Sequence, residues 1–154
     1  AMNYYNLKNQ LVKSVTPGGV VTLYTYDNLG RQISQAIDMN RNGEIDAADL
    51  VTSTAYSYGT QNGKTVSITT QTRSQGANNA VISVKKQSVD GLESWQTNLN
   101  GLTTHTKLER LGGGNTRQTV TNPDGTKVVT NSNNGRVITV QSINSDNTNG
   151  NLIT

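Results

Sequence analysis

Residues 20–34 read VVTLYTYDNLGRQIS and hold the clearest strand–turn–strand signal in the chain. Side chains along residues 20–26 alternate between two faces, with Leu23 on one face and the rings of Tyr24 and Tyr26 on the other, which is the period of a β-strand. The following Asp27 suits the start of a tight turn, and Gly30 accepts the positive φ that such a turn requires. The segment therefore predicts a β-hairpin.

Comparable turn signals, rich in Gly, Asn, Asp and Pro, recur at residues 17–19, 61–63, 77–79, 89–91, 98–101, 112–115, 122–125 and 133–135. Short runs rich in Val, Ile, Thr and Tyr lie between them, and helical spacing is not sustained anywhere. The pattern predicts an all-β chain of antiparallel hairpins in sequence order, with about ten or eleven strands. At most one helical turn is expected, around Asp46 to Val51. Residues 1–154 are interpreted as a single β-repeat segment of a larger protein.

The composition limits both the core and the partners. Only 32% of the 154 residues are hydrophobic and Phe is absent, so a thin core is expected. The net charge is +3, and the basic residues are scattered instead of gathered with aromatic side chains, which argues against nucleic-acid binding. Cysteine is absent, which excludes disulfides and thiolate chemistry. No apolar run approaches the ~18 residues of a membrane span.

Residues 25–34 are echoed by residues 130–139, with a weaker copy at 5–12 and a faint one at 87–94. Tyr24-Thr25-Tyr26-Asp27-Asn28-Leu29-Gly30-Arg31 resembles the signature of YD repeats, also called Rhs repeats, and residues 16–22 resemble the linker between two such repeats. The resemblance is good over residues 5–37. Beyond them the Tyr and Asp of the signature are lost, and only the turn glycines and the strand pattern remain.

This resemblance implies a non-enzymatic, structural role in a large secreted or cell-surface shell. The expected partners are neighbouring YD repeats of the parent chain, and the expected location is extracellular or on the bacterial cell surface. Self-association through the open edges of the sheet is also expected, because a cut repeat array exposes unpaired strand backbone.

Residues 38–49 read DMNRNGEIDAAD and match the spacing of a twelve-residue calcium loop. Calcium prefers six to eight oxygen ligands, and Gly43 at the sixth position permits the sharp bend around the ion. Ile45 at the eighth position is expected to anchor the loop in apolar surroundings. The predicted ligands are the side chains of Asp38, Asn40, Asn42, Asp46 and Asp49, with the backbone carbonyl of Glu44.

The loop is similar to that of EF-hands and, because Asp49 stands at the twelfth position, to the loops of dockerin modules. Dockerins carry two such loops with long helices, whereas this chain has one loop and returns at once to strand-like sequence. The cohesin-binding function of dockerins is therefore not expected here. The predicted cofactor is calcium alone, bound to an insertion in the repeat.

No catalytic residues are predicted. His105 lies in a strand-like run without a recognisable acid–base network, and Glu93 with Glu109 would make only a chance glycosidase pair. Trp95 favours a packing role, although a carbohydrate- or surface-binding β module that uses Tyr and Trp95 side chains is the alternative function. An enzyme fragment is the least supported class.

Overall fold

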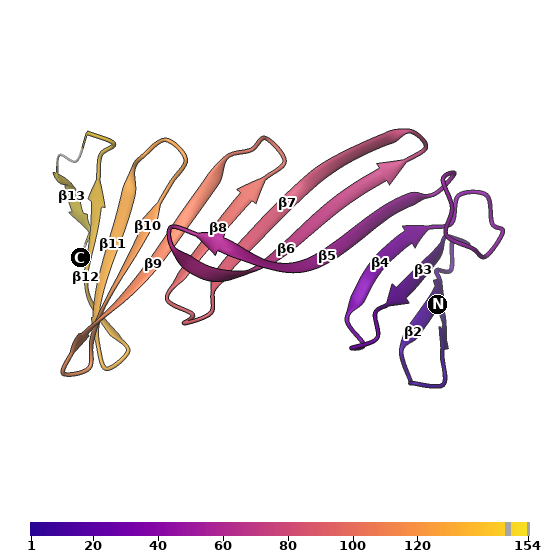
Figure 1. Cartoon of the computed structure of the whole chain (residues 1–154), viewed down its shortest axis with the longest axis horizontal. Helices are drawn as coiled ribbons and strands as arrows, with labels where there is room; N and C mark the ends of the chain where they lie inside the picture. Colours follow the sequence, from indigo (N-terminus) through magenta and orange to yellow (C-terminus); the bar gives the residue numbers. More distant parts are fainter. Residues whose placement is uncertain (147–148, 154) are drawn as a thin grey trace. The chain divides into compact units, whose positions relative to one another are not determined.

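The computed structural model describes residues 1–146 and 149–153, and within them it contains thirteen strands and no helix. The strands hydrogen-bond in sequence order from β1 to β13, with antiparallel neighbours (Figure 1). Their bounds are β1 Met2–Tyr5, β2 Leu11–Val15, β3 Val21–Tyr26, β4 Gln32–Ile37, β5 Leu50–Gln61, β6 Lys64–Gln75, β7 Asn78–Ser88, β8 Glu93–Asn98, β9 Thr103–Gly112, β10 Asn115–Thr121, β11 Lys127–Asn133, β12 Arg136–Ile143 and β13 Asn149–Ile153.

The predicted all-β fold and hairpin order are confirmed, and the number of strands is somewhat larger than expected. One reason is that short segments such as β1 pair as strands although their sequence carries little periodicity. Around Asp46 the chain makes a single turn, in which Asp49 N donates to Asp46 O at 3.3 Å, and β5 begins directly afterwards. None of the described residues form a helix suited to crossing a bilayer.

The chain divides into two compact units. The first comprises Ala1–Tyr56 with Thr69–Ser83, and the second comprises Ser57–Ile68 with Val84–Thr154. Strands β5, β6 and β7 are long, with eleven or twelve residues each, and contribute to both units. Residues 38–49 lie in the first unit, whereas Trp95 and His105 lie in the second.

One five-residue turn recurs in both units. The first residue donates its N–H to the carbonyl of the fifth, and the fourth donates its N–H to the carbonyl of the first. In the described part of the chain, copies begin at Asn6, Thr16, Asp27, Asn98 and Asn122. Their fourth residues all have positive φ and are Asn9, Gly19, Gly30, Gly101 and Gly125. The turn within residues 24–31 is therefore a backbone conformation that recurs in segments whose sequence no longer resembles that signature.

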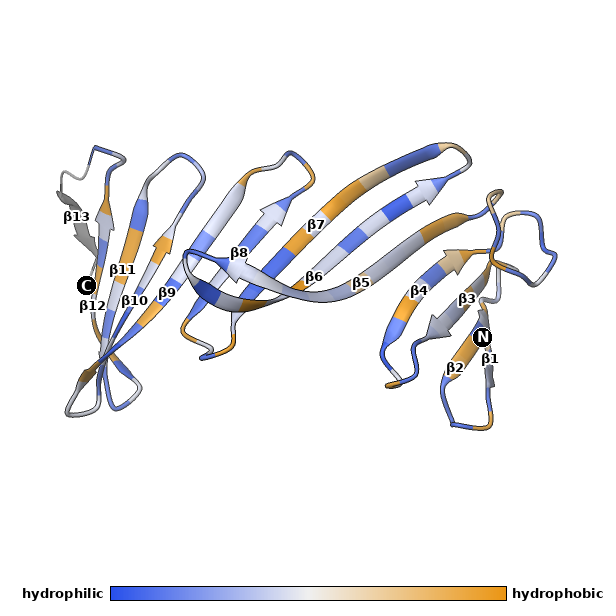
Figure 2. Cartoon of the chain, viewed as in Figure 1, coloured by the Kyte–Doolittle hydropathy of each residue, from blue (hydrophilic) through white to orange (hydrophobic). Residues whose placement is uncertain are grey.

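The core is thin in each unit. Leu23 and Ala36 face each other across β3 and β4 in the first unit and are 6% and 0% exposed. Val66 and Trp95 are the buried hydrophobic side chains described in the second unit. Figure 2 shows hydrophobic and hydrophilic residues interleaved along the strands. Hydrogen bonding along the sheet thus accompanies little apolar burial, as the composition indicates.

The insertion of residues 38–49 connects β4 to β5. Ile37 and Leu50 are paired across these strands, so both ends of the insertion start from adjacent positions of the sheet. Asp38 N donates to Val21 O of β3 at 3.0 Å, and Gly76 N of the β6–β7 turn donates to Ala47 O at 2.8 Å. The insertion is therefore anchored at its entry and its exit to neighbouring parts of the first unit.

Candidate metal centre

Alternate side chains of the insertion turn back onto its own backbone. Asn40 Oδ1 accepts from Asn42 N at 3.1 Å, and Asn42 Oδ1 accepts from Glu44 N at 2.8 Å. The chain then passes through Gly43, whose φ of +82° lies in the left-handed region that favours glycine. The alternation and the glycine bend give the loop the coiled path that its sequence spacing predicts.

Asp38 is almost fully buried, and only one of its two carboxylate oxygens has a hydrogen-bond partner. Oδ2 accepts from Gly43 N at 3.0 Å, across the bend of the loop. Oδ1 is buried and has no hydrogen-bond partner. The residue as a whole is 5% exposed. A buried carboxylate oxygen without a donor is unusual, because burial of an unsatisfied charged group is costly.

Asp49 is fully buried at the other end of the insertion. Its Oδ1 accepts from Met39 N at 2.9 Å and its Oδ2 accepts from Asp46 N at 3.1 Å. The side chain therefore ties the last residue of the loop to Met39, near its start, and to Asp46 through backbone N–H groups. Asp38 and Asp49 are thus two buried carboxylates at the base of one short loop.

Asp46 receives several donors near the exposed part of the loop. Its Oδ1 accepts from Ala48 N at 2.7 Å, and its Oδ2 accepts from the amide nitrogens of Asn40 and Asn42 at 2.9 Å and 2.7 Å. The hydrogen bond from Ala48, followed by those from the two amides, holds the pKa of Asp46 below its usual value. Asp46 is therefore anionic at neutral pH.

The loop concentrates negative charge without a basic partner. It contains four acidic residues and one arginine. None of the ion pairs among the described residues involves an acidic side chain of residues 38–49. Among the described residues, the groups that hydrogen-bond to the Asp46 carboxylate are amide N–H groups. A cation in this loop would satisfy Asp38 Oδ1 and offset the like charges of the three Asp side chains.

The structure does not bring the acidic side chains together as a finished metal site. In the described part of the chain, no three His, Cys, Asp or Glu side chains converge as a metal-binding group. Half of the predicted ligand set consists of Asn oxygens and the Glu44 carbonyl, and both Asn side chains turn their nitrogens toward Asp46. Binding of a cation would require these two amides to turn their oxygens inward. The predicted ligands therefore stay a prediction.

A second polar cluster, in the second unit, was not predicted from the sequence. Glu93 Oε1 lies 2.7 Å from Lys64 Nζ, and Glu93 Oε2 lies 3.0 Å from His105 Nε2. Lys64 Nζ also lies 3.3 Å from Asp90 Oδ2. Trp95 is 6% exposed and stacks on the His105 ring, with centroids 4.8 Å apart. This arrangement agrees with a packing role for Trp95 and removes its ring as a platform for sugars.

Electrostatics in this cluster favour ion pairs over acid–base chemistry. Hydrogen bonds from Ser88 and Leu92, with a smaller contribution from Lys64, lower the pKa of Asp90 to about 2. The hydrogen bond from Lys64, followed by that from His105, keeps the pKa of Glu93 below its usual value, although burial opposes this. Glu109 pairs with Lys107 at 2.9 Å. Glu93 and Glu109 are thus both engaged by cations, as structural carboxylates are.

Part of this cluster could have been derived from the sequence. The turn that begins at Asn98 sets a hairpin register in which Trp95 faces His105, and the structure shows that pair. Lys64 could not have been found in this way, because it lies on β6 and reaches Glu93 only through the order of the sheet.

The fold and the loop together define a class: an antiparallel hairpin-repeat sheet with one acidic insertion. The family model described as RHS Repeat matches residues 5–44. The match covers the hairpins from Tyr5 of β1 through β4 and the first residues of the insertion, and supports the YD/Rhs resemblance of residues 24–31. No curated protein matches the chain significantly.

Proposed function

We propose that the chain is a non-enzymatic, structural β-repeat segment of a secreted or cell-surface YD/Rhs-type protein, locally stabilised by calcium. The match to the RHS repeat model, the hairpins in sequence order and the recurrence of one turn in both units support the structural part. Neighbouring repeats of the parent chain would continue the sheet at its edges, where unpaired backbone groups offer hydrogen bonds.

The proposal that calcium binds here rests on Asp38 Oδ1, which is buried and has no hydrogen-bond partner. A buried anionic oxygen needs a donor or a cation, and no N–H or O–H group reaches this one. The Gly43 N–H holds the other oxygen of the same carboxylate and so orients Oδ1. Among biological cations, calcium suits the set best, because the set is composed of oxygens and the loop spacing is that of a calcium loop.

Calcium would be held by Asp38, Asn40, Asn42, Asp46, Asp49 and the Glu44 carbonyl. Its charge would offset the three aspartates, and the ion would fix the loop between the adjacent ends of β4 and β5. Loops of this kind in extracellular modules bind calcium with Kd values of about 10⁻⁴ to 10⁻³ M, and the neutral Asn ligands point to the range of about 10⁻⁵ to 10⁻³ M. Such affinities favour a location where calcium is plentiful.

Isothermal titration calorimetry with calcium tests the proposal. Wild type is expected to bind one ion, the double variant Asp38→Ala with Asp49→Ala none, and Asp124→Ala the same as wild type. Asp124 is the matched control because it also caps a turn, outside the loop. Magnesium is expected to bind more weakly, since it demands a tighter octahedron. A wild type that releases no heat, with a melting temperature insensitive to chelator, would refute the calcium site.

A further inference from the structure

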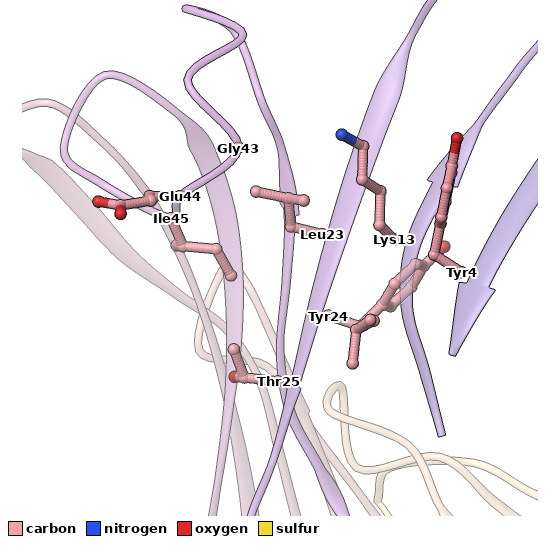
Figure 3. A pocket seen from close by; sticks show the side chains of 9 residues that line it. Tyr4, Lys13, Leu23, Tyr24, Thr25, Gly43, Glu44 and Ile45 are labelled. Atoms are coloured by element: carbon pink, nitrogen blue, oxygen red, sulfur yellow. The ribbon is translucent and has the colours of Figure 1, made fainter. Parts of the chain in front are cut away.

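The loop of residues 38–49 also forms one wall of a pocket on the first unit. The pocket has a volume of about 690 Å³, within the usual range for small-molecule sites. Gly43, Glu44 and Ile45 line one side, and Tyr4 and Lys13 line the other. Figure 3 shows Leu23 between these two sides, with the Ile45 side chain directed inward and the Glu44 carboxylate directed away.

The pocket combines an apolar interior with one unpaired cation. Leu23 and Ile45 supply aliphatic surface, and Tyr4 supplies a ring. Lys13 Nζ lies 5.7 Å from the centroid of the Tyr4 ring. No carboxylate of the described residues lies within ion-pair distance of Lys13. A cation with only a ring beside it retains most of its capacity to attract an anion, since a cation–π contact is weak at an exposed site.

We propose that this pocket binds an apolar molecule that carries one carboxylate, and that calcium in the adjacent loop is required for the binding. Lys13 pairs with the carboxylate, while the apolar body lies between Leu23, Ile45 and Tyr4. The dependence on calcium rests on the function proposed above. Because Gly43 and Ile45 are part of the calcium loop, opening of that loop removes one wall of the pocket.

Free small acids and the C-termini of apolar peptides share this chemistry. The probes are phenylbutyrate with its neutral analogue phenylbutyramide, and a short peptide ending in Phe with a free or an amidated C-terminus. Saturation-transfer NMR on the full chain, in excess calcium, measures the affinities. Phenylbutyrate is expected to bind with a Kd on the order of 1 mM and at least about fivefold more tightly than the amide. The free peptide binds as well as phenylbutyrate only if the pocket also accepts C-termini.

Variants at Lys13 separate the pocket from the calcium site. Lys13→Gln is expected to weaken phenylbutyrate binding at least about fivefold, Lys13→Arg to preserve it, and both to bind calcium as wild type does. Chelator is expected to weaken phenylbutyrate binding to wild type by a similar factor. Calcium binding without any preference for the charged probe overturns this inference and leaves the proposed function standing. Equal probe binding with and without calcium overturns the coupling, and absence of calcium binding overturns the calcium part of the proposed function.

Discussion

At the scale of single residues, Asp38 is the most informative side chain of the molecule. It combines near-complete burial, one oxygen held by Gly43 and one oxygen without a partner. The structural repeat alone does not require an acid at this position, because its neighbours Ile37 and Leu50 already close the sheet. The unpartnered oxygen is therefore the observation on which the proposed calcium site rests.

Replacement of Asp38 by Asn tests the proposed calcium site, because the sign of its effect on stability is expected to depend on calcium. With chelator present, Asp38→Asn is expected to be as stable as wild type or more stable, since it removes an uncompensated buried charge. With calcium at about a hundredfold excess over its Kd, wild type gains about 2.7 kcal/mol that the variant lacks. Thermal denaturation in both buffers measures the two differences. A variant that is less stable than wild type by the same amount in both would show that Asp38 has a purely structural role.

The residues around Glu93 predict a dependence of stability on pH. The folded-state pKa values of Glu93 and Asp90 lie below their ordinary values of 4.5 and 3.8, and that of Asp90 falls to about 2. Their contribution is thus complete above the unfolded values and is lost as the pH falls from about 4.5 toward 2. The groups that face Glu93 are Lys64 of β6, His105 and Lys107 of β9, and Asp90 beside Lys64.

Urea denaturation between pH 2 and pH 6 measures this dependence, in a window set by the pKa values of Asp90 and Glu93. Lys64→Gln is expected to flatten the profile by removing the main cause of the Glu93 shift, whereas Ser88→Ala removes the main cause of the Asp90 shift. Lys8→Gln is the control, because Lys8 lies in the first unit and takes part in none of the ion pairs among the described residues. At alkaline pH the sign reverses, since the pKa of Lys64 is raised and its contribution is lost as the pH rises through that value. An unchanged profile in Lys64→Gln would exclude this network as the source.

At the scale of elements, the recurring turn joins β1 to β2, β2 to β3, β3 to β4, β8 to β9 and β10 to β11. Each copy joins two strands through the same pair of backbone hydrogen bonds. In the copies that begin at Asn6, Asp27 and Asn98, the side-chain Oδ1 of the first residue also accepts from the second and fourth residues that follow. In one copy, Arg31 adds an ion pair to Asp27 at 2.7 Å. The signature of residues 24–31 is thus the copy in which an ion pair adds to the side-chain and backbone hydrogen bonds of the turn. Other copies form the same backbone hydrogen bonds with different residues.

The fourth position of the turn is occupied by Gly or Asn at positive φ, which predicts the effect of substitutions there. Gly101 has a φ of +76°, and a Cβ added there would meet no atom within 4 Å, so only backbone strain opposes a substitution. Gly101→Ala is expected to cost about 1–2 kcal/mol. Gly101→Asn should cost less, because Asn9 already occupies the same position in another copy with a φ of 58°. Urea denaturation of both variants provides the comparison, and equal losses would show that the left-handed conformation is not the limiting factor.

At the scale of the whole molecule, β1 stands at one end of the strand order and has a partner on one side only. All four of its residues are exposed, including Met2, Tyr4 and Tyr5. An exposed edge with large apolar side chains is a template for pairing with another strand. In a longer protein, the edge would pair with a neighbouring repeat, which is the partner expected for a YD/Rhs-type segment.

The isolated chain is therefore expected to self-associate as its concentration rises. The double variant Met2→Lys with Tyr5→Lys should reduce this association, because charges on an edge strand oppose pairing with another edge. The single variant Val137→Lys serves as control, since Val137 is also exposed but lies in β12, which has a neighbour on each side. Light scattering over a concentration series measures the difference. A monomer at every concentration, or an equal effect of the control, would contradict edge pairing.

The sequence by itself determined the hairpin order, the antiparallel sheet, the thin core and the position of the insertion between two paired strands. These features depend on local signals, namely the alternation along residues 20–26, the turns with Gly or Asn at positive φ, and the spacing of the acidic residues from Asp38 to Asp49. Local backbone preferences act over a few residues, so they can be read without knowledge of distant partners.

Only the tertiary structure decided which of these side chains is left unsatisfied and which distant residues meet. The burial of Asp38 beneath its own loop, the contact of Lys64 with Glu93 and the pocket between Lys13 and Ile45 all join residues from different strands or loops. Such contacts depend on the register and twist of the whole sheet, and a one-residue shift would turn each side chain to the other face. For this reason, the position of the insertion between two strands could be predicted from the sequence, whereas the electrostatic environment of the loop could not.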